Sequence, residues 1–226
     1  MNKAQIAPSM MCCDLYGLER TLAVFETVGI EYLHIDVMDG VFVPNYMLGP
    51  EYVKMLRRYT HIPMDIHLMV VNPEAKLDWF EPQPGDYVSV HFEATPHIHR
   101  AISRIRSAGA KAMLALNPGT PLCVVEELAP ELEAVLLMTV DPGFAGQKLI
   151  EPTLEKIVRL KAWMEEKGFG HIEIEVDGNV NLPNARRMRN AGADIFVAGT
   201  SGLFLPDVPL DRAVNNLRHA ISDNAE

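Results

Sequence analysis

Short apolar runs recur along the chain, separated by longer and more polar segments. The runs are five to seven residues in length and rich in Val, Ile and Leu, which is typical of β-strands buried on both faces. On this pattern we predict strands at residues 5–9, 32–38, 63–69, 86–92, 111–116, 134–140, 171–176 and 193–199.

Between strands the spacing of apolar residues changes to the helical period. This spacing predicts helices at residues 15–29, 97–109, 153–168 and 184–192, several of which end at a glycine, a common helix terminator. Alternating strands and helices predict a parallel sheet. Eight such units in 226 residues fit a single α/β domain, a closed (β/α)8 TIM barrel with eight helices over residues 1–226. An open doubly wound sheet is the alternative, but no GxGxxG motif follows the first strand.

Composition and charge restrict the partners of this domain. The chain is 48% hydrophobic and 22% charged, as in soluble globular proteins, and its net charge is −10 with no Lys/Arg-rich run. We therefore expect neither nucleic acid nor a membrane surface as a partner, whereas a small phosphorylated substrate fits. Three cysteines, two of them adjacent, give no disulfide framework, and no signal-peptide pattern is present. We expect a cytoplasmic protein.

The candidate chemistry lies at the ends of the strands, where TIM barrels place their active sites. In LHIDVMDG, alternation puts His34, Asp36 and Met38 on one face, opposite the aliphatic Leu33 and Ile35. Other predicted strands also carry polar residues or methionines near their ends. The strand-end residues that we select from them are Ser9, Asp65, His67, Met69, Met138 and Asp177.

Each of these polar residues could be a hydrogen-bonded core group, but several together point to a metal site. Carboxylates buried side by side need a proton or a cation, and no Lys or Arg stands at these strand ends. Two imidazoles with two of these carboxylates suit Zn²⁺, Fe²⁺, Mn²⁺ or Co²⁺ better than Ca²⁺. The methionines either fill the core or line the site and exclude water from it.

Glycine-rich turns follow three successive strands near the end of the chain. The turns DPGFAGQ, DGN and AGTSG occupy residues 141–147, 177–179 and 198–202. TIM barrels bind phosphate in such loops, where successive backbone N–H groups form an anion-binding nest. The phosphate-binding candidates are Gly143, Gly146, Gly178, Gly199, Thr200 and Ser201.

Taken together, these motifs resemble the ribulose-5-phosphate 3-epimerase family of barrels. The resemblance rests on HIDVMDGVFVPN, MDIHLMV, ALNPGTP, MTVDPGFAGQ, EVDGN and GTSGLF, which occur in order between residues 34 and 204. It implies a metal-dependent isomerase that inverts C3 of a ketose phosphate, and it implies a homo-oligomer. The metal would be one divalent ion, Zn²⁺, Fe²⁺, Mn²⁺, Co²⁺ or Mg²⁺.

The resemblance also assigns roles to individual residues. It implies that His34, Asp36, His67 and Asp177 bind the metal, and that Asp36 and Asp177 are the catalytic acid/base pair. It makes Ser9 a substrate contact. It also implies that the glycine loops hold the phosphate. Independently of the resemblance, Met38, Met69 and Met138 fall at equivalent depths just beyond the metal candidates, and we expect them to lie next to the substrate.

Several positions depart from the usual ribulose-5-phosphate pattern. Asp141, Ala145, Asn179 and Gly202 resemble the D-allulose-6-phosphate 3-epimerase branch, whose product is D-fructose 6-phosphate. We therefore expect the six-carbon substrate, with conversion of D-ribulose 5-phosphate to D-xylulose 5-phosphate as the alternative. Asn179 remains a candidate substrate contact, although a phosphate nest accommodates asparagine less readily than glycine.

Two other classes of function fit the barrel less well. A Schiff-base aldolase needs a lysine at a strand end, but Lys111 begins its strand and Lys148 lies beyond the loop glycines. A non-catalytic binding protein would not need two facing carboxylates. His91 and Glu93 stay open between contact with the site and ordinary packing.

Overall fold

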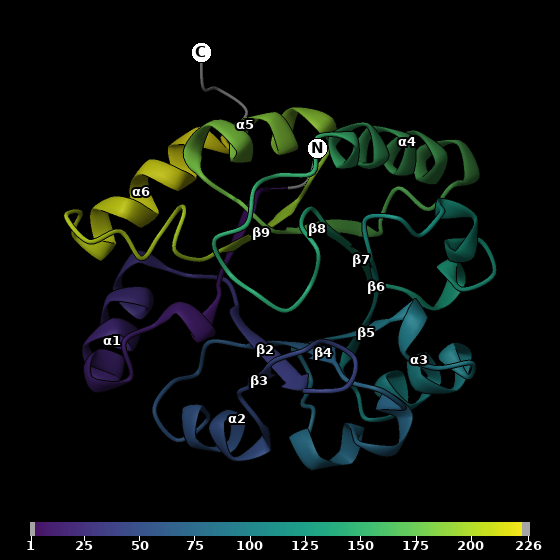
Figure 1. Ribbon diagram of the computed structural model, residues 1–226, viewed down its shortest axis with the longest axis horizontal. Coiled ribbons are helices and arrows are strands. Elements are labelled where there is room, and N and C mark those ends of the chain that lie inside the picture. The colour runs from purple at the N-terminus through teal and green to yellow at the C-terminus, as the bar shows by residue number, and fades with distance from the viewer. Residues whose placement is uncertain (1–2, 223–226) are drawn as a thin grey trace.

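Eight parallel strands form a ring with the helices outside it (Figure 1). The computed structural model describes residues 3–222, so residues 1–2 and 223–226 of the predicted domain lie outside the described residues. The strands are β1 Gln5–Pro8, β2 Leu33–Asp39, β4 Met64–Met69, β5 Tyr87–His91, β6 Lys111–Leu116, β7 Ala134–Met138, β8 Glu173–Asp177 and β9 Ile195–Ala198. Their order is β1-β9-β8-β7-β6-β5-β4-β2, and a parallel bridge between Ser9 and His34 joins the two ends. The predicted TIM barrel is confirmed.

A short extra strand extends the second barrel strand. This strand, β3 (Tyr46–Met47), pairs antiparallel with the end of β2. Two residues give no periodic signal, so the pattern of apolar positions did not predict it. The turn between β2 and β3 is held by Asp39, whose carboxylate accepts from the backbone N–H groups of Val41 and Phe42 and from Lys76. Burial alone would raise the pKa of Asp39, but these hydrogen bonds lower it to about 2.

The four predicted helices are present, with small differences at their ends. The α-helices of residues 3–222 are α1 Leu18–Val28, α2 Pro50–Leu56, α3 Ile98–Ser107, α4 Pro152–Lys167, α5 Leu182–Ala191 and α6 Leu210–Ala220. Gly29, Gly168 and Gly192 end their helices in the left-handed conformation, as their positions in the sequence indicated. Within this described part of the chain, none is long and apolar enough to span a membrane.

The expectation of eight helices was wrong. Only short 3₁₀ helices connect β4 to β5 and β6 to β7, including Pro73–Ala75, Leu77–Phe80 and Leu122–Val125. These connections are rich in proline, which lacks the N–H group that an α-helix needs and restricts the preceding residue. The barrel therefore has eight strands but fewer α-helices than units.

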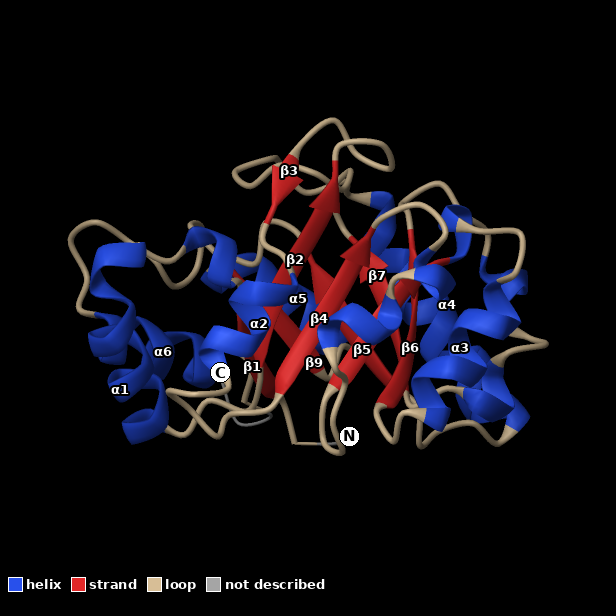
Figure 2. Cartoon of the chain, turned by 90° about the horizontal axis from the view of Figure 1, so that it is seen from below, coloured by secondary structure: helices blue, strands red, loops and turns tan. Residues whose placement is uncertain are grey.

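Alternation along the strands divides the core into two layers. Leu33, Ile35 and Val37 of β2 point outward and pack with the helices, whereas His34 and Asp36 point into the barrel. The barrel strands pair in parallel with one another, and Figure 2 shows β2 and β4 running toward the same end of the molecule. Their carboxyl ends therefore meet at one mouth.

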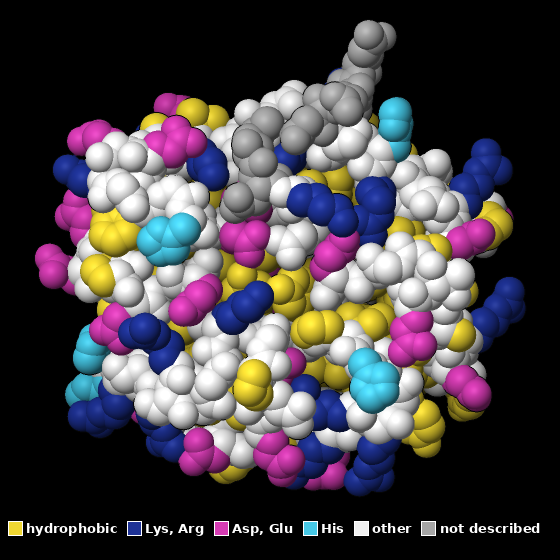
Figure 3. All heavy atoms as spheres, turned by 180° about the vertical axis from the view of Figure 1, so that it is seen from behind, with side chains coloured by type: hydrophobic (Ala, Val, Ile, Leu, Met, Phe, Trp, Pro, Cys, Tyr) yellow, Lys and Arg dark blue, Asp and Glu magenta, His cyan; other side chains and the backbone are white. Residues whose placement is uncertain are grey.

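The opposite end of the barrel is filled by side chains. Glu173 accepts hydrogen bonds from Gln5 and from the hydroxyl of Tyr87, and Lys111 donates to the hydroxyl of Tyr32. Seen from this end, charged side chains of both signs surround a central apolar area (Figure 3). Because side chains fill this end, the mouth is where we expect a small-molecule site.

Candidate active site

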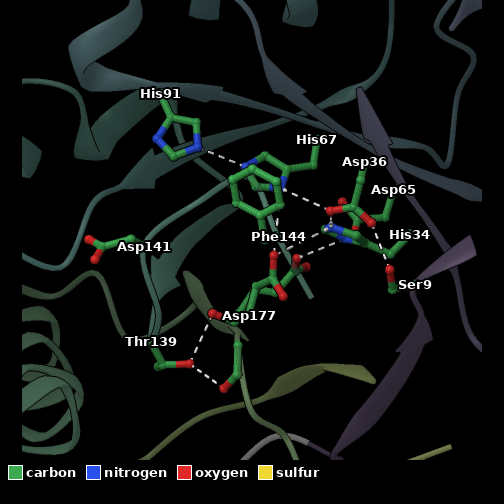
Figure 4. Close-up of polar contacts among 12 residues, drawn as sticks. Ser9, His34, Asp36, Asp65, His67, His91, Thr139, Asp141, Phe144 and Asp177 are labelled. Carbon is green, nitrogen blue, oxygen red and sulfur yellow. Dashed lines mark hydrogen bonds and ion pairs between the residues drawn. The ribbon is translucent and has the colours of Figure 1, made fainter. Parts of the chain in front are cut away.

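Four side chains from three strands converge at the mouth of the barrel (Figure 4). His34 and Asp36 lie on β2, His67 on β4 and Asp177 at the end of β8, and the register places Asp36 beside His67. His34 Nε2 lies 3.4 Å from Asp36 Oδ1 and 3.9 Å from Asp177 Oδ2. His67 Nδ1 lies 3.9 Å and 3.8 Å from the same two oxygen atoms.

The donor atoms of this group suit a metal ion. One ligand atom from each residue lies within 4.8 Å of every other. His34 Nε2 and His67 Nδ1 are buried and have no hydrogen-bond partner, which is costly unless a ligand occupies the space between them. Two imidazole nitrogens and two carboxylate oxygens could hold Zn²⁺ or another divalent transition metal.

A second pair of carboxylates lies behind His34, deeper in the barrel. Asp65 Oδ2 is 2.5 Å from His34 Nδ1, and Glu175 Oε1 is 3.5 Å from it. Both acids are fully buried. Asp65 turns the imidazole so that Nε2 faces the mouth, as carboxylates behind metal-bound histidines do. Glu175 was missed in the sequence, although it stands two residues before Asp177 and so shares its face of β8.

In the absence of a metal, protons must compensate this concentration of negative charge. Burial lowers the pKa of His34, but Asp65 and Asp36 outweigh it and the net pKa lies well above the ordinary value. Burial and the nearby Asp65 raise the pKa of Glu175. Burial and the neighbouring carboxylates also raise the pKa of Asp177 to about 7, although His34 opposes them. The site therefore retains protons that a metal ion could replace.

Ser9 and the three methionines surround the polar group. The Ser9 hydroxyl donates to Asp36 Oδ2 at 2.7 Å, which fixes that carboxylate. Met38 and Met69 pair across β2 and β4, and Met138 lies next to Asp177 in the register of β7 and β8. All three methionines line the cavity and are almost fully buried, so they make an apolar lining beside the carboxylates.

The glycine-rich loops after β7, β8 and β9 line the same cavity. The structure brings all the predicted loop residues to it, namely Gly143, Gly146, Gly178, Asn179, Gly199, Thr200 and Ser201. Gly178 has φ +125°, and a Cβ there would lie 2.8 Å from the backbone nitrogen of Val140. Only glycine allows this close approach of the two loops.

Asn179 takes a conformation that glycine usually occupies. Its φ is +52°, a region in which asparagine is one of the better tolerated residues. Its side-chain amide donates to the carbonyl of Gln147 and so ties the loop after β8 to the loop after β7. Asp141 is exposed at the edge of the cavity, and Figure 4 shows its carboxylate apart from the converging group.

The aldolase alternative is not supported by the lysines. Lys111 lies at the closed end of the barrel, bonded to Tyr32, and Lys148 is exposed.

His91, whose role the sequence left undecided, lies directly against His67, with 2.8 Å between the two Nε2 atoms. Sequence spacing gave no sign of this contact, because it depends on the pairing of β4 with β5.

Comparison with known proteins decides the family. The sequence profile of the ribulose-phosphate 3 epimerase family matches residues 5–204. The chain belongs to this family.

Curated relatives support the assignment over nearly the whole chain. The ribulose-phosphate 3-epimerase of Bacillus subtilis is 44% identical over 197 residues, 87% of this chain and 91% of the relative. The chloroplastic ribulose-5-phosphate-3-epimerase of Arabidopsis thaliana is 43% identical over 198 residues, 87% of this chain and 70% of the relative. Members of the epimerase family are isomerases, and the chain is an enzyme of this class.

Solved structures with little sequence identity share the fold. A crystal structure of KGPDC from Streptococcus mutans superposes with a TM-score of 0.73 at 13% identity, over 97% of this chain and 99% of that one. At this identity the likeness supports the TIM-barrel fold alone.

Metal binding by this epimerase should strengthen as pH rises. Between about pH 4 and 7 the native metal-free protein holds a proton on Asp177 that the unfolded chain has released, so the contribution of this carboxyl to the free energy of unfolding falls with rising pH in this window. A metal ion must displace that proton, so the Zn²⁺-induced rise in Tm should be larger at about pH 8 than at about pH 6. Thermal unfolding with and without Zn²⁺ measures this.

Two histidine variants provide the controls for that measurement. His34→Gln should lose the Zn²⁺-induced rise in Tm, whereas His99→Gln, at an exposed histidine, should keep it. An equal rise in wild type and His34→Gln would contradict the assignment of the metal to this group.

Proposed function

We propose that this enzyme interconverts D-ribulose 5-phosphate and D-xylulose 5-phosphate by moving a proton at C3. The observation that carries the proposal is the pair Asp36 and Asp177, which approach the mouth from β2 and β8 with β1 and β9 between those strands. Inversion next to a ketone requires a base on one face of the carbon and an acid on the other. Two carboxylates from different sides of the ring meet this requirement.

In the proposed mechanism the two aspartates exchange roles with the direction of reaction. One carboxylate takes the C3 proton and becomes a carboxylic acid, and the other, initially protonated, delivers its proton to the opposite face. Ser9 holds one oxygen of Asp36, which leaves the other directed toward the histidines.

We propose His34, Asp36, His67 and Asp177 as the residues that hold one divalent ion. Zn²⁺, Fe²⁺, Mn²⁺, Co²⁺ and Mg²⁺ are all candidates for it. Such an ion supplies Lewis-acid stabilisation of the negative charge that develops when the C3 proton leaves, which is worth several kcal/mol.

The rest of the cavity is suited to binding a sugar phosphate. Met38, Met69 and Met138 would exclude water from the reacting carbon and keep the carboxylates basic. The loops after β7, β8 and β9 would hold the phosphate through backbone N–H groups, at the place where barrels commonly bind it.

The five-carbon sugar is preferred because the relatives at about 40% identity are named for ribulose phosphate. The six-carbon substrate expected from the sequence, D-allulose 6-phosphate, lacks support from these relatives. It stays a second candidate because of one specific observation: Asp141, Ala145 and Asn179 all line the cavity.

Some expectations about the whole protein stay predictions. They are the single domain over residues 1–226, a homo-oligomer, a cytoplasmic location, and the absence of nucleic-acid or membrane partners.

Removing either proposed base should abolish most of the activity. Asp36→Asn and Asp177→Asn should each lower kcat at least about 10²- to 10⁴-fold, because an amide cannot accept the C3 proton. Steady-state kinetics with metal-saturated protein measures this, and Asp211→Asn, at an exposed position on α6, is the matched control. Near-wild-type turnover by either site variant with metal bound would contradict the two-base mechanism.

The substrate preference should follow the curated relatives. Wild-type kcat/KM should be higher for D-ribulose 5-phosphate than for D-allulose 6-phosphate, measured side by side in one coupled assay. A higher value for the six-carbon sugar would reverse the assignment, and Asn179→Gly would then test whether this loop residue contributes to the preference.

A further inference from the structure

A chain of three buried or half-buried side chains runs from the candidate metal site to the rim of the barrel. His67 Nε2 lies 2.8 Å from His91 Nε2, and His91 Nδ1 lies 3.2 Å from Glu93 Oε2. The two imidazole rings stack at 5.0 Å, and the ring of Phe42 packs on His91 at 4.7 Å (Figure 4 shows the two histidines). His67 and His91 are fully buried, so neither ring can satisfy these nitrogen atoms with bulk water.

The far end of this chain is firmly held. Glu93 accepts from the backbone N–H of Asn117 at 3.0 Å and from the hydroxyl of Thr120. The loop that carries these donors is fixed in turn by Lys156 of α4, whose ammonium group donates to the carbonyls of Asn117 and Pro118. Burial would raise the pKa of Glu93, but the hydrogen bonds from His91, Thr120 and Asn117 lower it to about 2.

The direction of the protons along this chain is determined by its two ends. Ionised Glu93 can only accept, so His91 must carry its proton on Nδ1 and present a lone pair at Nε2. His67 must then donate from Nε2, which leaves its Nδ1 as a lone pair toward Asp36 and Asp177. That unpartnered Nδ1 is the atom that the metal site needs.

We infer that Glu93 and His91 are positioning residues that fix the tautomer of His67 for metal binding. This inference rests on the metal site of the proposed function. His34 and His67 thus present different ring nitrogens to the same space, and each is fixed by a different device. Asp65 fixes the ring orientation of His34 by direct contact, and Glu93 fixes the tautomer of His67 through His91.

The test combines a tautomer measurement with a metal affinity. In metal-free protein labelled with ¹⁵N-histidine, NMR should find the ring proton of His91 on Nδ1 and that of His67 on Nε2. Glu93→Gln replaces an acceptor by a group that can also donate, so the reversed tautomers should appear. Its Zn²⁺ affinity, measured by chelator competition, should be weaker by about 10-fold or more.

Glu131→Gln is the matched control, because Glu131 also pairs with a histidine, exposed His99, at 2.9 Å. It should leave the Zn²⁺ affinity unchanged. A wild-type His91 proton on Nε2 would overturn the inference, as would a Glu93→Gln variant with wild-type tautomers and affinity.

The inference and the proposed function fail in different ways. The expected tautomers and Zn²⁺ affinities in a protein that epimerises neither ketose phosphate would support the positioning role and overturn the function. Reversed tautomers in an active wild-type enzyme would overturn the positioning role alone.

Discussion

The structure depends on how the negative charge of several buried carboxylates is compensated inside the barrel. Asp36, Asp65, Glu175 and Asp177 all lie within the reach of one imidazole, that of His34. Carboxylates at such short distances and this depth cannot all be ionised without a counter-charge. Protons supply part of it in the metal-free protein, and the two unpartnered imidazole nitrogens mark where a cation would supply the rest.

The barrel makes this arrangement possible because its register is fixed. Aliphatic outward faces bury β2 and β4 against the helices, so their inward faces can carry polar groups without loss of the core. A shift of one residue along β2 would point His34 and Asp36 outward. The side-chain plug at the opposite end closes the barrel, and the chemistry is confined to the mouth.

Much of the fold and of the site could be predicted from the sequence, because period-2 alternation reports directly which residues face inward. Alternation brought His34, Asp36 and Met38 to one face, and the loop glycines pointed to the same mouth. The prediction of eight helices missed the connections that lack α-helices, because it was based on the alternation of strands with longer polar segments and took no account of the prolines in those segments. The sequence also did not show that His91 contacts His67 or that Glu175 approaches His34, because those contacts depend on how the side chains of different strands meet inside the ring. The loop residues that suggested a six-carbon sugar did not decide the substrate, and the side chain of one of them, Asn179, donates to the backbone of Gln147.

The central claim is that separate carboxylates act on the two faces of C3. Its most direct test is a single turnover, in H₂O, of D-ribulose 5-phosphate that carries deuterium at C3, with the product analysed by NMR. Two bases predict a product with hydrogen at C3, because the deuterium stays on the first carboxylate and the second delivers a different proton. A product that retains most of the deuterium at C3 would mean that one group serves both faces, and it would contradict the account.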